Sequence, residues 1–147
     1  MLIRPARASD FDELYALGKS FPELRTSCQF DFMEPEEFLT AMTTPSGVFL
    51  CAEEGRLIGF VYANTNDIEK RDSENTIACL VYIAVLPEFR RLGVGQALHD
   101  ECLARLRKRN VKYLYVWANV ESPSIRAFME GQGFVPGGTY LWMDREL

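Results

Sequence analysis

The sequence predicts an α/β fold in which a mixed sheet of about seven strands packs against about four helices. Three observations point to this class. Segments with strand composition alternate along the chain with segments of helical periodicity. The segment 76–86 is long and almost wholly apolar, so a strand there must be covered on both of its faces. A turn signal at 53–56 separates two apolar segments and indicates that part of the sheet is antiparallel.

The first half of the chain predicts two helices and three strands. Ser9 followed by Asp12 resembles a capping box, and Gly18 is suited to end the helix that they start. Pro35 suits the first turn of a second helix, because its missing N–H needs no partner there. The elements expected in this half are a strand over 2–4, a helix that ends at 18, a helix that begins near 34–35, and antiparallel strands over 47–52 and 57–63.

The second half predicts a central strand, two helices, a further strand and a final hairpin. Four apolar side chains recur every four residues and give one helix a single apolar face: Val94, Leu98, Cys102 and Leu106. Pro123 suits the first turn of a shorter helix. The elements expected here are the strand 76–86, a helix that begins at 94, the strand 111–118, a helix over 123–132, and a hairpin over 133–143 that turns at 136–138.

Length and composition are those of one globular domain, which we expect to span residues 1–147. Apolar residues make up 48% of the chain and charged residues 25%, which excludes disordered and fibrous classes. The net charge of −5 disfavours nucleic acid as a partner. The chain lacks an apolar run of about 18 residues and the pattern of a signal peptide. We therefore expect a cytoplasmic protein without a membrane partner.

The cysteines and the single histidine do not have the spacing of a metal site. Cys28, Cys51, Cys79 and Cys102 lie far apart, mostly within apolar segments, without the Cys-x-x-Cys spacing of zinc or dithiol sites. We expect buried thiols and no metal. His99 lies one turn into the helix that begins at 94, where a packing or surface role is expected rather than catalysis.

The turn between the central strand and the next helix has the features of an anion site. Gly93 and Gly95 allow the backbone to approach a ligand, and the first turn of a helix has N–H groups without intrahelical acceptors. These donors suit a phosphate or diphosphate, and Arg90 and Arg91 add positive charge. The alternative is that both glycines only make a tight strand-to-helix turn. Walker and Rossmann motifs do not match, because the Lys-Ser or Lys-Thr pair and the third glycine are missing.

The segment 85–95 resembles the signature of the GNAT superfamily of N-acetyltransferases. That signature is Arg/Gln-x-x-Gly-x-Gly/Ala after a strand that ends in Val-x-Pro, and this chain has Val-Leu-Pro-Glu-Phe-Arg-Arg-Leu-Gly-Val-Gly there. The resemblance extends in the family's order to the segments 3–6, 57–60, 123–125 and 133–134, and so covers essentially the whole chain. It implies the family's fold, acetyl-CoA as the donor and a primary amine as the acceptor.

For the cosubstrate, the resemblance implies a site in two parts. The diphosphate of CoA is expected on the backbone amides of the glycine turn, and the pantetheine arm is expected to run beside the central strand like an added strand. The amides of that strand can also polarise the thioester carbonyl. The residues expected at the site are Ile83, Ala84 and Val85 on the strand, Arg90, Arg91, Leu92, Gly93, Val94, Gly95 and Gln96 at the turn, and Asn119, Ser124 and Phe128 farther along the chain.

Catalysis requires a group that accepts a proton from the amine, because a free alkylamine has a pKa of roughly 10. One candidate base is Glu74, at the end of a polar segment that precedes the central strand. The same segment also carries Asp67, Glu69 and Asp72. A solvated loop is the alternative interpretation of all four carboxylates. Tyr82, which strand alternation places opposite Val81 and Ile83, is a further catalytic candidate, with core packing as its alternative.

The departing thiolate is protonated in many GNAT enzymes by a tyrosine, which this chain lacks. Phe128 and Met129 occupy the two registers in which that tyrosine is expected. A thiol pKa of roughly 8.5 lets a thiolate leave without a proton donor. Tyr140 in the final hairpin is the candidate replacement.

Together these features predict an N-acetyltransferase in which an amine of a small molecule or protein attacks acetyl-CoA directly. Acidic residues at 31–37 and 67–74 favour a cationic acceptor. The missing tyrosine motivates the alternative of a non-catalytic CoA-binding sensor or assembly subunit. A phosphate-binding domain unrelated to CoA is the third interpretation. If the hairpin over 133–143 is exposed, it would support a homodimer.

Overall fold

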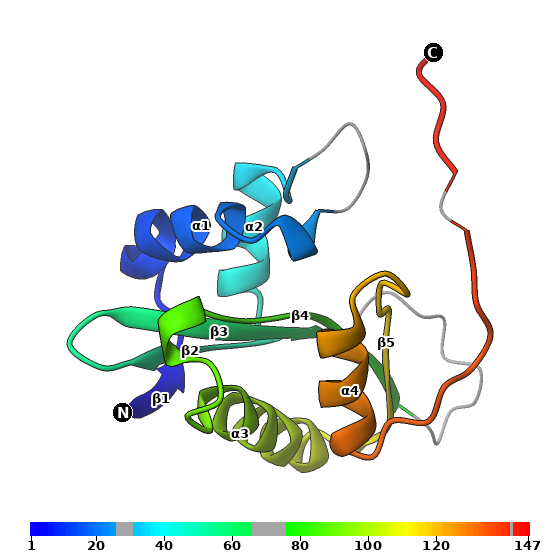
Figure 1. Cartoon of the computed structure of the whole chain (residues 1–147). Helices are drawn as coiled ribbons and strands as arrows, with labels where there is room; N and C mark the ends of the chain where they lie inside the picture. Colours follow the sequence, from blue (N-terminus) through cyan, green and yellow to red (C-terminus); the bar gives the residue numbers. More distant parts are fainter. Residues whose placement is uncertain (26–30, 66–75, 142) are drawn as a thin grey trace.

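The computed structural model describes residues 1–25, 31–65, 76–141 and 143–147, which form a five-stranded mixed sheet with helices on both faces (Figure 1). Its helices and strands are, in chain order, β1 (Leu2–Pro5), α1 (Phe11–Lys19), α2 (Pro35–Thr43), β2 (Val48–Glu53), β3 (Leu57–Asn64), β4 (Thr76–Val85), α3 (Val94–Lys108), β5 (Val111–Val116) and α4 (Pro123–Gly131). Short 3-10 helices lie at Ala8–Asp10, Pro22–Leu24 and Pro87–Phe89. The predicted α/β class is confirmed.

The order of the strands in the sheet follows their order in the chain. The pairs β1–β2, β2–β3 and β3–β4 are antiparallel, whereas β4 and β5 are parallel and are joined by α3. The predicted turn between β2 and β3 contains Gly55 with a φ of 71°, a backbone conformation that glycine adopts without strain. Antiparallel and parallel parts therefore lie in one sheet, as the sequence predicts.

Apolar side chains on the two faces of the sheet form two core layers. The layer under α1 and α2 contains Phe38, Phe60 and Tyr82, with ring centroids 6.0 Å apart between the two phenylalanines. The layer under α3 and α4 contains Leu98 and Met129. In Figure 1, α1 and α2 lie above the sheet and α3 lies below it. β4 supplies side chains to both layers, which confirms that this strand is covered on both faces.

A bulge interrupts β4 at Val81. The ladder with β3 pairs Tyr82 and Leu80 but shifts register between them, so Val81 is the extra residue. As a result, Val81 and Tyr82 both contact the α1–α2 layer, whereas Ile83 contacts the α3–α4 layer. The prediction that Tyr82 faces away from Val81 is therefore wrong, because strict alternation does not hold across a bulge.

The start of α1 also differs from the prediction. Ser9 lies within a 3-10 helix, and α1 begins only at Phe11. The carboxylate of Asp10 accepts a 2.8 Å hydrogen bond from the backbone N–H of Arg7 and a 2.7 Å hydrogen bond from the side chain of Arg4. Asp10, rather than a Ser9–Asp12 capping box, thus orders the entry into α1.

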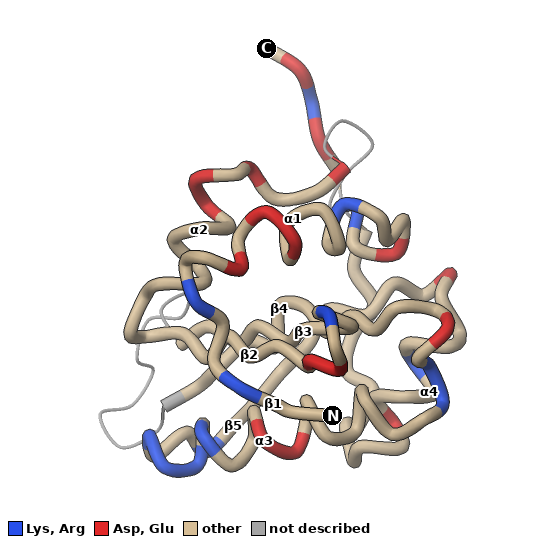
Figure 2. Tube along the Cα trace, turned by 90° about the vertical axis from the view of Figure 1, so that its left-hand side faces the viewer, with Lys and Arg blue, Asp and Glu red and all other residues tan. Residues whose placement is uncertain are grey.

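The hairpin expected over 133–143 is absent, because residues 134–141 and 143–147 contain no strand. The described sheet accordingly has five strands rather than about seven. Pro136 has no N–H to donate to a ladder, and the two glycines after it weaken a strand. Figures 1 and 2 both show the last residues projecting away from the body of the molecule.

Cys51, Cys79 and Cys102 are buried thiols that are not in disulfide bonds, which confirms that prediction for these three residues. Cys28 lies outside the described residues. Within the described ranges, no helix has the length and apolar character needed to cross a lipid bilayer.

Candidate functional site

The candidate site lies where β4 and β5 diverge. Residues 76–80 of β4 pair with β5, but β4 continues to Val85 and stays paired with β3 over that length. In the described chain, the edge of β4 that faces β5 therefore has no strand on it over residues 81–85. The bulge at Val81 lies at the point of divergence. Ile83, Ala84 and Val85, which the sequence predicts at the site, lie along this free edge.

Two residues with left-handed backbone build the turn that follows β4. Arg91 has a φ of 61° and Gly93 a φ of 83°. A Cβ added to Gly93 would meet no atom within 4 Å, so the backbone conformation, rather than a lack of space, favours glycine there. The side chain of Arg90 donates a 2.9 Å hydrogen bond from Nε to the carbonyl of Val85. This bond ties the turn to the end of β4.

The first turn of α3 presents backbone donors at the same place. The N–H of Ala97 donates a 2.9 Å hydrogen bond to the carbonyl of Gly93, which is the first bond of the helix. The N–H groups of Val94, Gly95 and Gln96 therefore have no intrahelical acceptor. Because α3 is 15 residues long, these donors also carry the positive end of a helix dipole. The arrangement can bind a phosphate or a diphosphate.

Gly95 allows α4 to pack against the turn. A Cβ at this position would lie 3.5 Å from the ring of Phe128 and 3.8 Å from the side chain of Val85. The side-chain oxygen of Gln96 accepts a 2.6 Å hydrogen bond from Gln132, just after α4. The structure thus brings Phe128, one of the predicted CoA contacts, next to the glycine turn.

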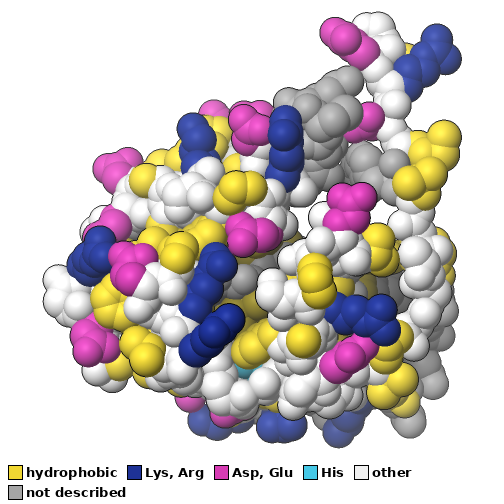
Figure 3. Space-filling view, in the orientation of Figure 1, with side chains coloured by type: hydrophobic (Ala, Val, Ile, Leu, Met, Phe, Trp, Pro, Cys, Tyr) yellow, Lys and Arg dark blue, Asp and Glu magenta, His cyan; other side chains and the backbone are white. Residues whose placement is uncertain are grey.

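Positive charge surrounds this turn. Arg90 and Arg91 are exposed, and Arg90 lies 3.5 Å from the carboxylate of Glu23. Within the described residues, none forms a hydrogen bond or an ion pair with Arg91. Figure 3 shows basic side chains over this part of the face, beside a hollow that separates it from the region of α4. A ligand with several negative charges is therefore favoured here.

Asn119 and Ser124 lie at the other end of α4. The side-chain oxygen of Asn119 accepts a 2.9 Å hydrogen bond from the backbone N–H of Glu121 and so closes the turn before α4. The amide NH2 of Asn119 is left to contact a ligand. Ser124 is exposed in the first turn of α4. Both residues are accessible, but they lie on a different segment from the glycine turn.

The two catalytic candidates that the structure describes do not lie at the turn. Tyr82 is buried in the α1–α2 layer, where its ring lies 5.3 Å from that of Phe32. Burial, together with the negative charge of Glu37, raises the pKa of Tyr82 to about 12. Tyr140 is 75% exposed, and its ring packs edge-on against Trp117 at 5.6 Å. Glu74, like the three acidic residues before it, lies outside the described residues.

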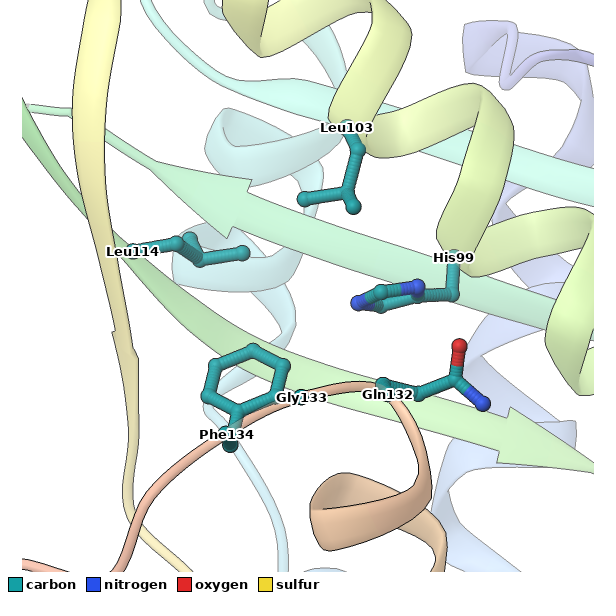
Figure 4. Close-up of a pocket in the computed structure, with 6 residues that line it drawn as sticks. All are labelled: His99, Leu103, Leu114, Gln132, Gly133 and Phe134. Carbon is teal, nitrogen blue, oxygen red and sulfur yellow. The ribbon is translucent and has the colours of Figure 1, made fainter.

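A second feature, which sequence reasoning missed, is a cavity beside His99. It has a volume of about 200 Å³ and is lined by His99, Leu103, Leu114, Gln132, Gly133 and Phe134 (Figure 4). His99 is 1% exposed, and neither of its ring nitrogens has a hydrogen-bond partner. Burial lowers its pKa, although Asp100 opposes this shift. The only signal in the sequence is that His99 adjoins the apolar stripe of α3.

Comparison with known proteins identifies the family. A family model described as the acetyltransferase (GNAT) family matches residues 11–134. The chain belongs to the GNAT family. This GNAT chain thus contains a glycine turn, a bulge in β4 and a point at which β4 and β5 diverge.

A curated relative supports the same assignment. An uncharacterized N-acetyltransferase from Methanocaldococcus jannaschii is 33% identical over 91 residues, which make up 60% of this chain and 38% of that protein. The match therefore spans less than half the length of the relative.

Solved GNAT structures share the fold. The aminoglycoside antibiotic 6'-N-acetyltransferase AAC(6')-IG from Acinetobacter haemolyticus gives a TM-score of 0.78 at 16% identity, covering 100% of this chain and 99% of that chain. AAC(6')-Iy in complex with the bisubstrate analog CoA-S-monomethyl-acetylneamine gives a TM-score of 0.75 at 17% identity, covering 99% and 98%. At these identities the similarity establishes the fold.

Proposed function

We propose that this GNAT protein is an acetyl-CoA-dependent N-acetyltransferase that acts on a primary amine, with residues 1–147 as its catalytic domain. The observation that carries the proposal is the turn from β4 into α3. There, exposed arginines, left-handed residues at Arg91 and Gly93, and the free N–H groups of a helix N-terminus all lie beside an unpaired strand edge. An activated thioester that carries a diphosphate fits both parts of this arrangement.

The diphosphate of CoA binds at the glycine turn in this proposal. The N–H groups of Val94, Gly95 and Gln96 donate to its oxygens, and Arg91 supplies a charged partner. Arg90 holds the turn in place through its bond to Val85. Leu92, which is 69% exposed, covers the bound diphosphate from the solvent side.

The pantetheine arm continues along the free edge of β4. Backbone groups of Ile83, Ala84 and Val85 hydrogen-bond with its amides, as they would with another strand. An N–H of the same edge donates to the thioester carbonyl and stabilises the oxyanion that forms when the amine attacks. The bond from the carbonyl carbon to nitrogen forms, the bond to sulfur breaks, and CoA leaves as a thiolate.

The acceptor approaches from the side of α1 and α2. Acidic residues occur along both helices (Figure 2), and Glu34, Glu36 and Glu37 lie at the start of α2. Their charge attracts a cationic amine, whether it belongs to a small molecule or to a protein. The names of the structural neighbours include aminoglycoside acetyltransferases, which supports a small polyamine-like acceptor as the first class to test.

Proton transfer is assigned to Glu74 and Tyr140 rather than to Tyr82, which is buried. Glu74 is the first candidate for the base that accepts the proton of the amine. The thiolate of CoA, with a pKa of roughly 8.5, leaves without an acid, and Tyr140 is the candidate if one is used. The remaining contacts that we propose for CoA are Asn119, Ser124 and Phe128 on or beside α4.

The test combines binding and transfer with the purified protein. Calorimetry should detect binding of CoA, with weaker binding of ADP and of pantetheine, because each occupies half of the site. Labelled acetyl-CoA and a panel of polyamines, aminoglycosides and peptides should then give an acetylated amine. CoA binding without transfer to any amine would favour the sensor interpretation. Equal affinity for CoA and ADP would favour a general phosphate-binding domain.

A further inference from the structure

The cavity beside His99 has the size and the walls of a small ligand site. Its volume is about 200 Å³, and three elements supply its apolar walls: Leu103 of α3, Leu114 of β5 and Phe134, which follows α4. An apolar cavity of about 150 Å³ is large enough to hold a benzene ring. A single aromatic ring therefore fits this space.

The wall that follows α4 is fixed by the end of that helix. Gly133 has a φ of 88°, and its N–H donates a 3.0 Å hydrogen bond to the carbonyl of Glu130. The N–H of Phe134 donates a 3.1 Å hydrogen bond to the carbonyl of Met129. In this helix-ending motif, the residue after the left-handed glycine packs back against the helix. The ring of Phe134 is thereby held against the α3–α4 layer, where it lines the cavity.

His99 supplies a polar group to this apolar space. Its side chain is buried, and its ring extends from α3 into the cavity, toward Leu114 and Phe134 (Figure 4). Neither ring nitrogen has a hydrogen-bond partner among the described residues. The carboxylate of Asp100 lies 3.7 Å from Nδ1, which is beyond hydrogen-bond distance. Because buried polar groups are normally hydrogen-bonded, this ring is matched to a ligand that supplies the missing bond.

The chemistry of the imidazole defines the class of ligand. Burial lowers the pKa of His99, so the ring is uncharged at neutral pH. An uncharged imidazole has one nitrogen that accepts a hydrogen bond and one N–H that donates. A hydroxyl group can bond with either of them, whereas a charged group is costly to bury between apolar walls. An aromatic ring also suits the neighbouring rings, since the centroids of His99 and Phe134 lie 5.9 Å apart.

We propose that this cavity binds a small uncharged aromatic molecule that carries one hydroxyl group, of the phenol class. The aromatic ring packs against the apolar walls, and the hydroxyl forms a hydrogen bond with His99. The residues that line the cavity include none of the turn residues 90–96. One connection joins the two places, the 2.6 Å hydrogen bond from Gln132, which lines the cavity, to Gln96. The ligand site is therefore separate from the site proposed for CoA.

Nuclear magnetic resonance with phenol as the probe tests the site. Phenol added to the isotope-labelled full chain should shift the backbone amide signals of Leu114 and Gly133 until they saturate. The ring nitrogens of His99 should shift as well, and their signals are unambiguous because the chain has a single histidine. Phenol should also bind in the presence of excess CoA.

A comparison of phenol with toluene tests the hydrogen bond, because toluene has a similar shape but no hydroxyl. In His99→Leu, the ratio of the phenol affinity to the toluene affinity should fall roughly 5-fold to 150-fold, since the buried hydroxyl then has no partner. Leu103→Phe should fill the cavity and abolish the binding of both probes. Leu39→Phe is the matched control, because Leu39 is exposed on α2, and it should bind both probes as the parent chain does. Circular dichroism and thermal unfolding check the fold of each variant.

Four outcomes would overturn the proposal. If phenol gives no saturable shift in the parent chain, the cavity is not a ligand site. An unchanged affinity ratio in folded His99→Leu would mean that His99 does not contact the hydroxyl, and phenol binding that survives in folded Leu103→Phe would place the ligand elsewhere. Displacement of phenol by CoA would place phenol in the CoA site. If CoA itself does not bind, the proposed function fails, whereas the phenol and toluene titrations still decide this proposal.

Discussion

The guanidinium Nε of Arg90 lies 2.9 Å from the carbonyl oxygen of Val85 and donates a hydrogen bond to it. Arg90 thereby connects the last residue of β4 to the turn before α3. Its neighbour Arg91 has no such bond within the described chain and is exposed. The two arginines therefore differ in role: Arg90 supports the turn, whereas the side chain of Arg91 is available to a ligand.

Arg91→Ala should weaken CoA binding without changing stability. A hydrogen bond to a charged group contributes about 1.5–3 kcal/mol, so the dissociation constant should rise by roughly 10-fold to 150-fold. Calorimetry measures this rise, and thermal unfolding checks the fold. Arg126→Ala is the control, because Arg126 is exposed on α4 and pairs with Glu130. Unchanged affinity in Arg91→Ala would place the diphosphate elsewhere.

Gly93→Ala and Gly55→Ala form a matched pair. Both glycines have positive φ, 83° and 71°, and neither would bring a Cβ within 4 Å of another atom. Each substitution should cost about 1–2 kcal/mol of unfolding free energy, measured in urea, because alanine is strained in this region. Only Gly93→Ala should also reduce the affinity for CoA, since its Cβ enters the space where a ligand approaches. Equal CoA affinity in the two variants would mean that the glycine turn is not part of the CoA site.

Tyr82→Phe should retain transfer activity within about threefold. Burial raises the pKa of Tyr82 to about 12, so the phenol is a poor match for a thiolate with a pKa of roughly 8.5 and does not ionise near neutral pH. A general acid or base would instead contribute about 10²-fold to 10⁴-fold. The rate constant kcat, compared across pH, measures the difference. A loss of 10²-fold or more, with the fold intact, would assign Tyr82 to catalysis.

The stability of the protein should fall as the pH drops from 7 to 5 because of His99. Burial lowers the pKa of the folded imidazole below its unfolded value, so the unfolded chain binds the proton first. The unfolding free energy should therefore begin to decrease below about pH 6.5, with a slope of at most about 1.4 kcal/mol per pH unit. Urea unfolding at several pH values measures this slope.

His99→Leu should remove most of this pH dependence, because His99 is the single histidine of the chain. Carboxylates titrate mainly below pH 5 and contribute little in this window. An equal slope in the variant and the parent protein would mean that another group is responsible.

Local patterns in the sequence predicted the elements around the site. The apolar period that begins at Val94 predicted α3, and Gly93 and Gly95 predicted the turn before it. These features depend on residues within a few positions of one another. The bulge at Val81 was missed because it depends on how β4 pairs with β3, a relationship that no short segment contains.

The final hairpin was the main error, and its cause is similar. Pro136 and the two glycines after it have the composition of a turn, but a turn makes a hairpin only if strands on both sides find partners. Phe134 instead contacts His99 at a ring distance of 5.9 Å, and Tyr140 contacts Trp117 at 5.6 Å. Those two contacts, between segments far apart in sequence, direct the chain away from the sheet.

Three buried thiols have a consequence for the proposed binding of acetyl-CoA. Burial raises the pKa of Cys51 to about 11 and that of Cys102 to about 12, and Cys79 is buried as well. Thioesters exchange their acyl group with thiolates, not with thiols. Under the proposed function, these cysteines are therefore shielded from acetylation by the donor, and the folded chain would hold a reactive acyl group without modifying its own interior.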